Sequence, residues 1–154
     1  MGLFDWFSAL SKGDEKTAAA NVQSGGIKEE GMVHGLDFVA AIEAHRKWKE
    51  RLANYVDGTS AEKLDHATIC RDDQCALGKW IYKEGTQFVG HSPTFHQVKA
   101  KHAEFHVNAA QIVEKVQTGN KEQAAIMLHE GSFAKSSRDV QSLISKLYME
   151  TKGQ

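Results

Sequence analysis

Apolar residues recur at spacings of three, four and seven along much of the sequence, which is the spacing of one face of an α-helix. The first such stretch runs from Asp37, in the position of a helix N-cap, to about Tyr55, and it stops near Asp57-Gly58. Its apolar stripe consists of Phe38, Ile42, His45, Leu52 and Val56. His45 therefore lies on the apolar side of this predicted helix, away from its charged residues.

A second long helix is predicted over residues 93–117. Ser92 is a suitable N-cap, the proline that follows it is favoured at the first helical position, and Gly119 is a suitable end. Its apolar stripe consists of Phe95, Val98, His102, Phe105, His106, Ala109, Ile112, Val113 and Val116. Because His102 and His106 are four residues apart, they point from the middle of this stripe about one turn apart.

The last helix is predicted over about residues 120–151, with a bend or an interruption at Gly131 and Ser132. Its core side consists of Ala124, Ala125, Leu128, Val140, Leu143, Ile144, Leu147 and Tyr148. Between the first two long helices the pattern is less regular. There Ser60 is suited to cap a short helix over residues 61–67.

A further helix is predicted to begin near Cys75, with Asp72 or Asp73 as its cap, and to end near Gly85. In the first turn of a helix, exposed N–H groups and the helix dipole favour the thiolate form of a cysteine. Gly78 costs about 1 kcal/mol in a helix relative to alanine, so we expect another helix to approach closely at this position.

Three long helices and a shorter one, joined by short connections, predict an all-α fold. We expect an antiparallel four-helix bundle over residues 36–152, with an additional N-terminal amphipathic helix. Residues 1–35 form the N-terminal segment, in which a small, polar, glycine-broken linker follows the apolar residues. These apolar residues are Leu3, Phe4, Trp6, Phe7 and Leu10.

The apolar N-terminal residues are expected to pack on their own domain or on a second subunit. Membrane-surface contact through residues 3–10 is disfavoured because the polar face carries little positive charge. The myristoylation pattern also fails, since Trp6 stands where serine or threonine is required.

The composition is that of an ordinary soluble domain. The chain has 154 residues, of which 41% are hydrophobic and 25% charged, and its net charge of −1 gives no indication of nucleic-acid binding. No apolar run approaches the ~20 residues of a membrane span, and no signal peptide is visible. Two cysteines do not make a secreted disulfide framework, so we expect a cytoplasmic protein. Eight histidines are an unusual number and suggest metal ligands.

Cys75, His45, His102 and His106 are the candidate ligands of one tetrahedral zinc site in the bundle interior. The pair on one helix makes half of the site, and the other two side chains come from two further helices. Taken singly, however, a histidine on an apolar face is more often a hydrogen-bonded core residue, and a buried cysteine is more often inert. The pattern alone does not establish which of the eight histidines converge.

The remaining histidines and Cys70 are weaker candidates. They are His34 in the linker, His66 and His91 near turns, His96 away from the face of His102, and His129 on the last helix. A disulfide between Cys70 and Cys75 or a two-cysteine zinc site is conceivable, although the five-residue spacing fits neither common metal motif.

The sequence resembles the chemoreceptor zinc-binding (CZB) family from about Asp37 to Val116. The family pattern is a first-helix His-x-x-Trp, then Cys-x-x-Gly-x-Trp, then His-x-x-x-His with an aromatic residue before the second histidine. This chain has these elements in order, as His45-Arg46-Lys47-Trp48, Cys75-Ala76-Leu77-Gly78-Lys79-Trp80 and His102-Ala103-Glu104-Phe105-His106. The resemblance implies a four-helix bundle that binds Zn²⁺ through His45, Cys75, His102 and His106.

CZB domains are bacterial, cytoplasmic sensory modules of signal transduction and chemotaxis, usually attached to a chemoreceptor or a diguanylate cyclase. The resemblance therefore implies a non-enzymatic zinc or oxidant sensor, a homodimer, and a signalling partner from one of these pathways. This sequence contains neither a cyclase nor a signalling rod, so we expect a stand-alone member that acts through a partner or through self-association.

Two other functions fit a helical bundle. A hemerythrin-like di-iron protein would use His102 and His106, but it needs bridging carboxylates, and Lys49 stands four residues after His45. A metal-free adaptor bundle would use the N-terminal apolar face. A hydrolytic zinc enzyme is disfavoured, because four protein ligands leave no open position for water and no HExxH motif is present.

Overall fold

The structure is a computed structural model, and it describes residues 31–152. Its elements are β1 (Met32–Val33), β2 (Leu36–Asp37), α3 (Phe38–Asp57), α4 (His66–Ile69), α5 (Ala76–Trp80), the π-helical turn η1 (Ile81–Gly85), α6 (Thr86–Val89), α7 (Pro93–Gln117), α8 (Lys121–His129) and α9 (Ser132–Thr151). The described residues are thus mostly helical, which agrees with the predicted all-α class. The N-terminal amphipathic helix predicted in residues 1–10 lies outside the described residues.

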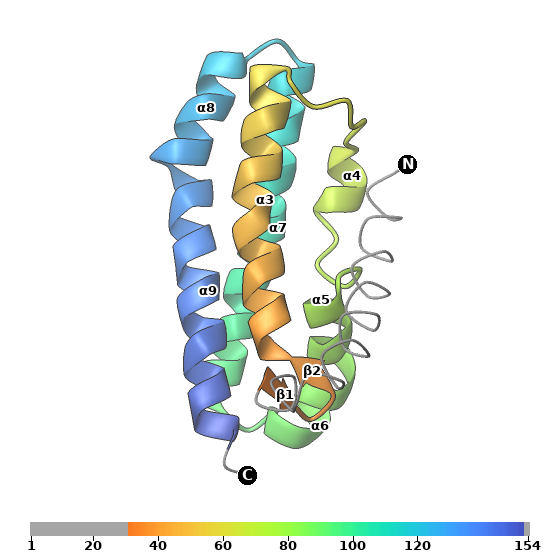
Figure 1. The fold of residues 1–154 in the computed structure, drawn as a ribbon, viewed down its shortest axis with the longest axis vertical. Coiled ribbons are helices and arrows are strands. Elements are labelled where there is room, and N and C mark those ends of the chain that lie inside the picture. Colours follow the sequence, from red (N-terminus) through yellow and green to blue (C-terminus); the bar gives the residue numbers. More distant parts are fainter. Residues whose placement is uncertain (1–30, 153–154) are drawn as a thin grey trace, which may run out of the picture.

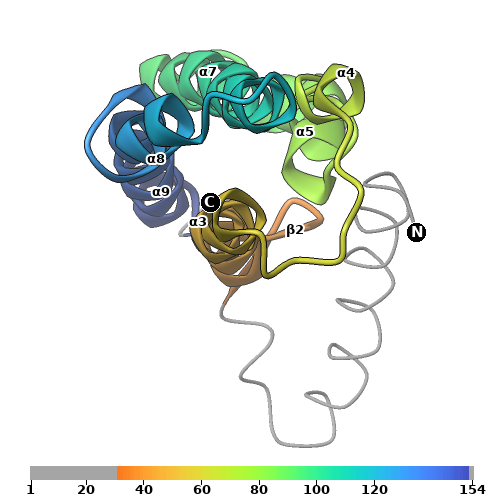
Figure 2. The same cartoon turned by 90° about the horizontal axis from the view of Figure 1, so that it is seen from above.

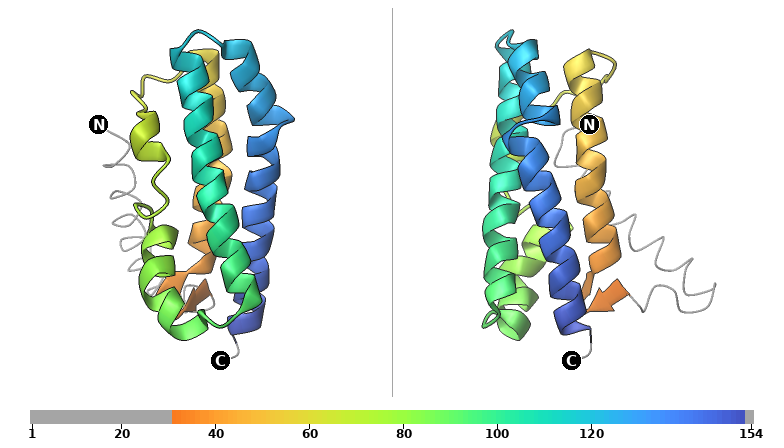
Figure 3. Two further views of the ribbon diagram at one scale, coloured as in Figure 1. Left: turned by 180° about the vertical axis from the view of Figure 1, so that it is seen from behind. Right: turned by 90° about the vertical axis from the view of Figure 1, so that its left-hand side faces the viewer.

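The long helices lie side by side along one axis, and the chain passes up and down between them (Figure 1). Helices α3 and α7 run in one direction, whereas α8 with α9, and the column formed by α4, α5 and α6, run in the other (Figures 1 and 3). Seen from above, α3 and α7 lie on opposite sides of the centre, with α9 on one flank and α5 on the other (Figure 2).

The predicted ends of the long helices agree closely with the structure. The Asp37 side chain accepts a hydrogen bond from the Ala40 N–H at 3.0 Å, and Gly58 ends α3 in the left-handed conformation, with φ of 81°. Ser92 caps α7 through the Phe95 N–H at 3.2 Å. The last helix is divided into α8 and α9 at residues 130–131, where an interruption was expected.

The region between α3 and α7 differs from the prediction. Residues 61–65 are not helical, and Asp65 rather than Ser60 caps the short helix α4. Neither Asp72 nor Asp73 caps α5, because Cys75 is itself the N-cap and its sulfur accepts from the Gly78 N–H at 3.4 Å. Helical patterns of a few residues specify boundaries poorly, since a single tertiary contact outweighs them.

A short hairpin precedes α3 in a stretch that the composition assigns to a linker. Strands β1 and β2 pair antiparallel, with Met32 opposite Asp37 and Val33 opposite Leu36. The hairpin lies at the same end of the molecule as α6 and the C-terminal end of α9 (Figure 1).

One apolar core runs between the helices. Its largest fully buried side chains are Trp48, Phe38, Phe95, Phe105, Phe133, Leu52, Ile69, Leu77, Ile81, Ile112 and Leu128. No helix among residues 31–152 is both long enough and apolar enough to span a membrane. Three histidines and a cysteine are buried within this otherwise apolar interior.

Candidate metal centre

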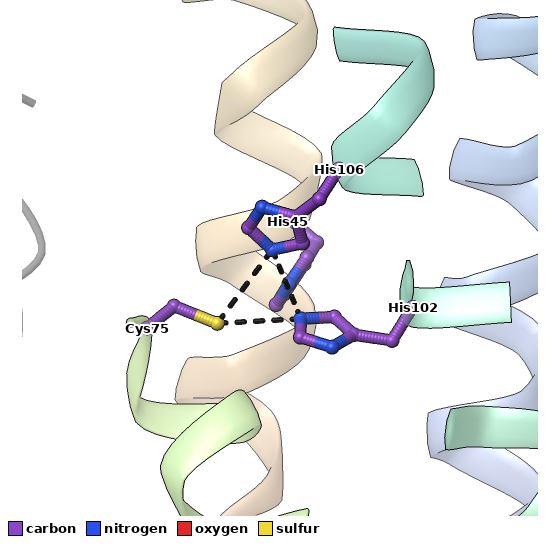
Figure 4. A group of neighbouring side chains, drawn as sticks. All are labelled: His45, Cys75, His102 and His106. Atoms are coloured by element: carbon purple, nitrogen blue, oxygen red, sulfur yellow. Dashed lines mark hydrogen bonds between the residues drawn. The ribbon is translucent and has the colours of Figure 1, made fainter. Parts of the chain in front are cut away.

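The four predicted ligand residues come together in the core. His45 lies in the middle of α3, Cys75 caps α5, and His102 and His106 lie one turn apart on α7 (Figure 4). Each is at most 4% exposed. One nitrogen or sulfur atom from each of them lies within 4.8 Å of the others. The structure therefore places side chains from three helices around one point that is closed to solvent.

The distances among Cys75, His102 and His106 are close to those around a tetrahedral zinc ion. Bonds of about 2.0–2.1 Å to nitrogen and 2.3 Å to sulfur separate two nitrogen ligands by about 3.3 Å, and nitrogen from sulfur by about 3.5 Å. Here the Nε2 atoms of His102 and His106 are 3.1 Å apart. The Cys75 sulfur lies 3.2 Å from the first of these atoms and 3.8 Å from the second.

Backbone carbonyl groups hold two of the imidazoles in the tautomer that metal binding requires. Nδ1 of His45 lies 2.7 Å from the Ala41 carbonyl oxygen, and Nδ1 of His106 lies 2.9 Å from that of Ile69. Because a carbonyl oxygen only accepts hydrogen bonds, each Nδ1 carries the proton and each Nε2 presents its lone pair. The Nε2 atom of His106 thus faces a sulfur and a second nitrogen with a lone pair to offer.

His102 is held by packing. Its ring centroid lies 5.0 Å from that of His45 and 4.6 Å from that of His106, in both cases edge to face. Its Nδ1 atom is buried and has no hydrogen-bond partner among the described residues. An unpaired polar atom in a core is costly, so an apolar side chain would be favoured here unless the imidazole had another role.

Burial keeps all four groups uncharged before a metal binds. Desolvation lowers the pKa of His45 to about 4, and it also lowers the pKa of His102 and of His106. It raises the pKa of the Cys75 thiol to about 12, an effect larger than that of the helix N–H groups that favour the thiolate. The site is therefore a set of neutral donors that a cation can draw together, with one proton to release.

The other histidines and Cys70 lie outside this group. His66, His91, His96 and His129 are exposed, and His34 is half-buried in the hairpin turn. Cys70 is exposed, and its thiol donates to the Ala67 carbonyl oxygen at 3.1 Å. Among the described residues, burial alone thus separates the convergent histidines from the rest.

Gly78 is kept by a close approach of backbone rather than by a neighbouring helix. A Cβ atom at this position would lie 1.7 Å from the Asp72 carbonyl oxygen and 3.1 Å from the Asp73 Cα. The loop before α5 therefore passes directly over the first turn of that helix, where Cys75 is the cap. Sequence reasoning missed this contact, and it missed the Ala41 and Ile69 carbonyl groups, because backbone atoms leave no residue-type signal.

Comparison with known proteins gives one match. Residues 45–113 match the family model described as the chemoreceptor zinc-binding domain. The searches of curated proteins and of solved structures found no match. The matched range begins at His45 and includes Cys75, His102 and His106.

We expect Gly78→Ala to lower the free energy of unfolding by about 1–3 kcal/mol and to weaken zinc binding, because the loop and α5 must move apart and displace Cys75. Denaturant unfolding with and without zinc measures both effects. Lys79→Ala, at the exposed next residue, is the matched control and should stay within about 0.5 kcal/mol of the parent. Equal stability and zinc affinity in the two variants would contradict a positioning role for the contact.

We expect the apparent zinc affinity to rise about tenfold per pH unit between pH 6.5 and 8. The Cys75 thiol, with a pKa of about 12, must lose one proton to bind, whereas the histidines, with lowered pKa values, have none to lose in this range. Calorimetry in buffers of different ionisation enthalpy counts the released protons. A pH-independent affinity would contradict a thiol that is protonated before zinc binds, and a release of two or more protons would mean that histidines are charged before binding.

Proposed function

Because residues 45–113 belong to the chemoreceptor zinc-binding family, we propose that this protein binds one Zn²⁺ ion through His45, Cys75, His102 and His106 and serves as a sensory or regulatory domain. The observation that carries the proposal is the convergence of four buried, neutral donors from three helices. Three imidazoles and a thiolate are a ligand set that suits zinc.

The donor set supports a regulatory rather than a catalytic role. A zinc ion with four protein ligands has no open position for water or substrate, which is the arrangement of structural sites. The convergent group also lacks a carboxylate, which a hydrolytic zinc enzyme would use as a base and a di-iron centre would use as a bridge. We therefore favour zinc binding without catalysis over the hemerythrin-like alternative.

Zinc bound here would join α3, α5 and α7, since each supplies a ligand. We infer that these helices belong to the antiparallel four-helix bundle expected from the sequence, with the column of α4, α5 and α6 in the place of one long helix. Binding energy gained only in the folded arrangement adds to the stability of that arrangement. The state of the metal would therefore set how firmly three helices are held together.

Oxidation of Cys75 is a second signal to which the proposed site would respond. Oxidation of a zinc-bound thiolate converts it to a sulfenic acid, a poorer ligand, and loosens the metal. The protein would thus respond to zinc or to oxidants, and pass the response to a chemoreceptor or diguanylate cyclase pathway or through a homodimer. Cytoplasmic location is a prediction from the cysteine content and the family resemblance, and dimerisation is a prediction from the resemblance.

Cys75→Ala tests the ligand assignment. We expect the parent protein to contain one zinc ion per chain, and Cys75→Ala to bind zinc at least about 100-fold more weakly with its helical content unchanged. Elemental analysis and competition with a chelator measure the two quantities. Cys70→Ala is the control, because this second cysteine is exposed and lies outside the group. Full zinc content together with the parental zinc affinity in Cys75→Ala would refute the proposed site.

Zinc release by hydrogen peroxide tests the redox response. We expect release to follow the transfer of one oxygen atom to the Cys75 sulfur, with water as the other product, and to reverse when a thiol reductant and zinc are added. A colorimetric chelator follows the metal, and mass spectrometry locates the oxygen. Cys70→Ala should release zinc at the parental rate. Retention of the metal after complete oxidation of Cys75 would rule out this response.

A further inference from the structure

The hairpin before α3 has a strained turn. His34 and Gly35 are its two central residues, and their φ angles are 48° and 84°. This combination is typical of the tight hairpin turn in which both central residues are left-handed, where glycine, asparagine and aspartate are the usual residues. Among the described residues, His34 is the one non-glycine residue with positive φ. Such a conformation persists where the surroundings hold it in place.

Two contacts from outside the hairpin hold this turn. The Trp80 indole Nε1–H donates a hydrogen bond to the His34 carbonyl oxygen at 2.8 Å. The His34 ring stacks on Phe88, with centroids 4.4 Å apart and planes 4° from parallel. The imidazole has no hydrogen bond at Nε2, because this atom is buried without a partner in the described part of the chain. The turn thus depends on side chains from α5 and α6.

Trp80 connects the hairpin to the metal centre. It is the last residue of α5, and Cys75 is the cap at the other end of this helix. Its ring is 4% exposed and packs edge to face on Phe38 and Phe95, with centroids 5.5 and 6.0 Å away. A shift of Cys75 would therefore displace the helix whose last residue holds the hairpin turn.

The second strand of the hairpin leads directly to the other side of the site. Strand β2 ends at Asp37, which is the N-cap of α3, and α3 carries His45. The hairpin is thus covalently continuous with one ligand helix and hydrogen-bonded to another. In Figure 1 the hairpin lies beside the lower ends of α3 and α6. The covalent connection through α3 and the hydrogen bond from α5 therefore both reach it.

We infer that the Trp80–His34 hydrogen bond couples metal occupancy at Cys75 to the order of the hairpin at residues 32–37. This inference rests on the proposed zinc site. With zinc bound, the separation of His45 and Cys75 is fixed, so α3 and α5 stand where Trp80 reaches the strained turn. Without zinc that separation is constrained by side-chain packing alone, and the hydrogen bond from Trp80 holds the turn less firmly. The hairpin lies outside the family match of residues 45–113, whereas Trp80 lies within it.

Hydrogen exchange of residues 31–37, with zinc and with a chelator, tests the inference. In the parent protein we expect zinc to slow exchange in the hairpin about fivefold to tenfold, the range given by one intramolecular hydrogen bond. Trp80→Phe removes the donor and keeps a ring between Phe38 and Phe95. It should bind zinc within about threefold of the parental affinity and lose the zinc-dependent difference in exchange.

Phe88→Leu is the matched control. It removes the stack on His34 and keeps the hydrogen bond, so exchange should rise in both states while the effect of zinc remains. Zinc-independent exchange in a parent protein that binds zinc would overturn the coupling and leave the proposed function intact. The coupling would also be overturned if Trp80→Phe kept the full difference. A parent protein that binds no zinc would contradict the proposed function instead.

If Trp80→Phe does not fold, the indole N–H of Trp80 in the parent protein decides the question by nuclear magnetic resonance. Its exchange with solvent should be slower in the zinc-bound protein, and Cys75→Ala should show the faster rate whether zinc is added or not. Equal exchange rates with and without zinc in the parent protein would overturn the inference.

Discussion

Four polar side chains that share one buried point are the constraint on which the rest of this fold depends. In His45 and His106 the Nδ1 atom donates to a backbone carbonyl group and Nε2 is left as an acceptor, and Nδ1 of His102 has no hydrogen-bond partner among the described residues. A hydrophobic core tolerates such a group when a cation receives the lone pairs. The same burial that makes the group costly without a metal keeps its histidines neutral and its thiol protonated, and so keeps competing protons off the nitrogen donors.

The six residues from Cys75 to Trp80 combine several of these demands in one short helix. Cys75 supplies the sulfur and also caps the helix. Gly78 leaves room for the backbone of the preceding loop, and Trp80 reaches the hairpin that begins the described chain. Helix α5 is five residues long and continues without a break into η1 and α6, so the helical turns extend from Ala76 to Val89. Its position is set by contacts at Cys75, Gly78 and Trp80, which makes it responsive to a change at any of them.

Much of this arrangement could be predicted from the sequence, for reasons specific to each element. The long helices α3 and α7 have caps at Asp37 and Ser92 and continuous apolar stripes, so their bounds follow from local pattern. The convergent residues could be named because their order and spacing resemble a known family. The cap of α5 is a local contact from the Gly78 N–H to the Cys75 sulfur, but cysteine is not among the usual capping residues. The hairpin could not be predicted, since its turn depends on a contact between residues far apart in the chain. That contact is the hydrogen bond from the Trp80 indole N–H to the His34 carbonyl oxygen.

The positions of α3 and α7 on opposite sides of the centre have a mechanical consequence (Figure 2). A bundle of parallel helices can shear, so that the shape of its cross-section changes while neighbouring helices stay in contact. A link between the two helices on opposite sides of the centre would prevent this shear. An ion bound by His45 of α3 and by His102 and His106 of α7 would be such a link. Its arrival or departure would therefore act on the cross-section of the whole molecule and not on one pair of helices.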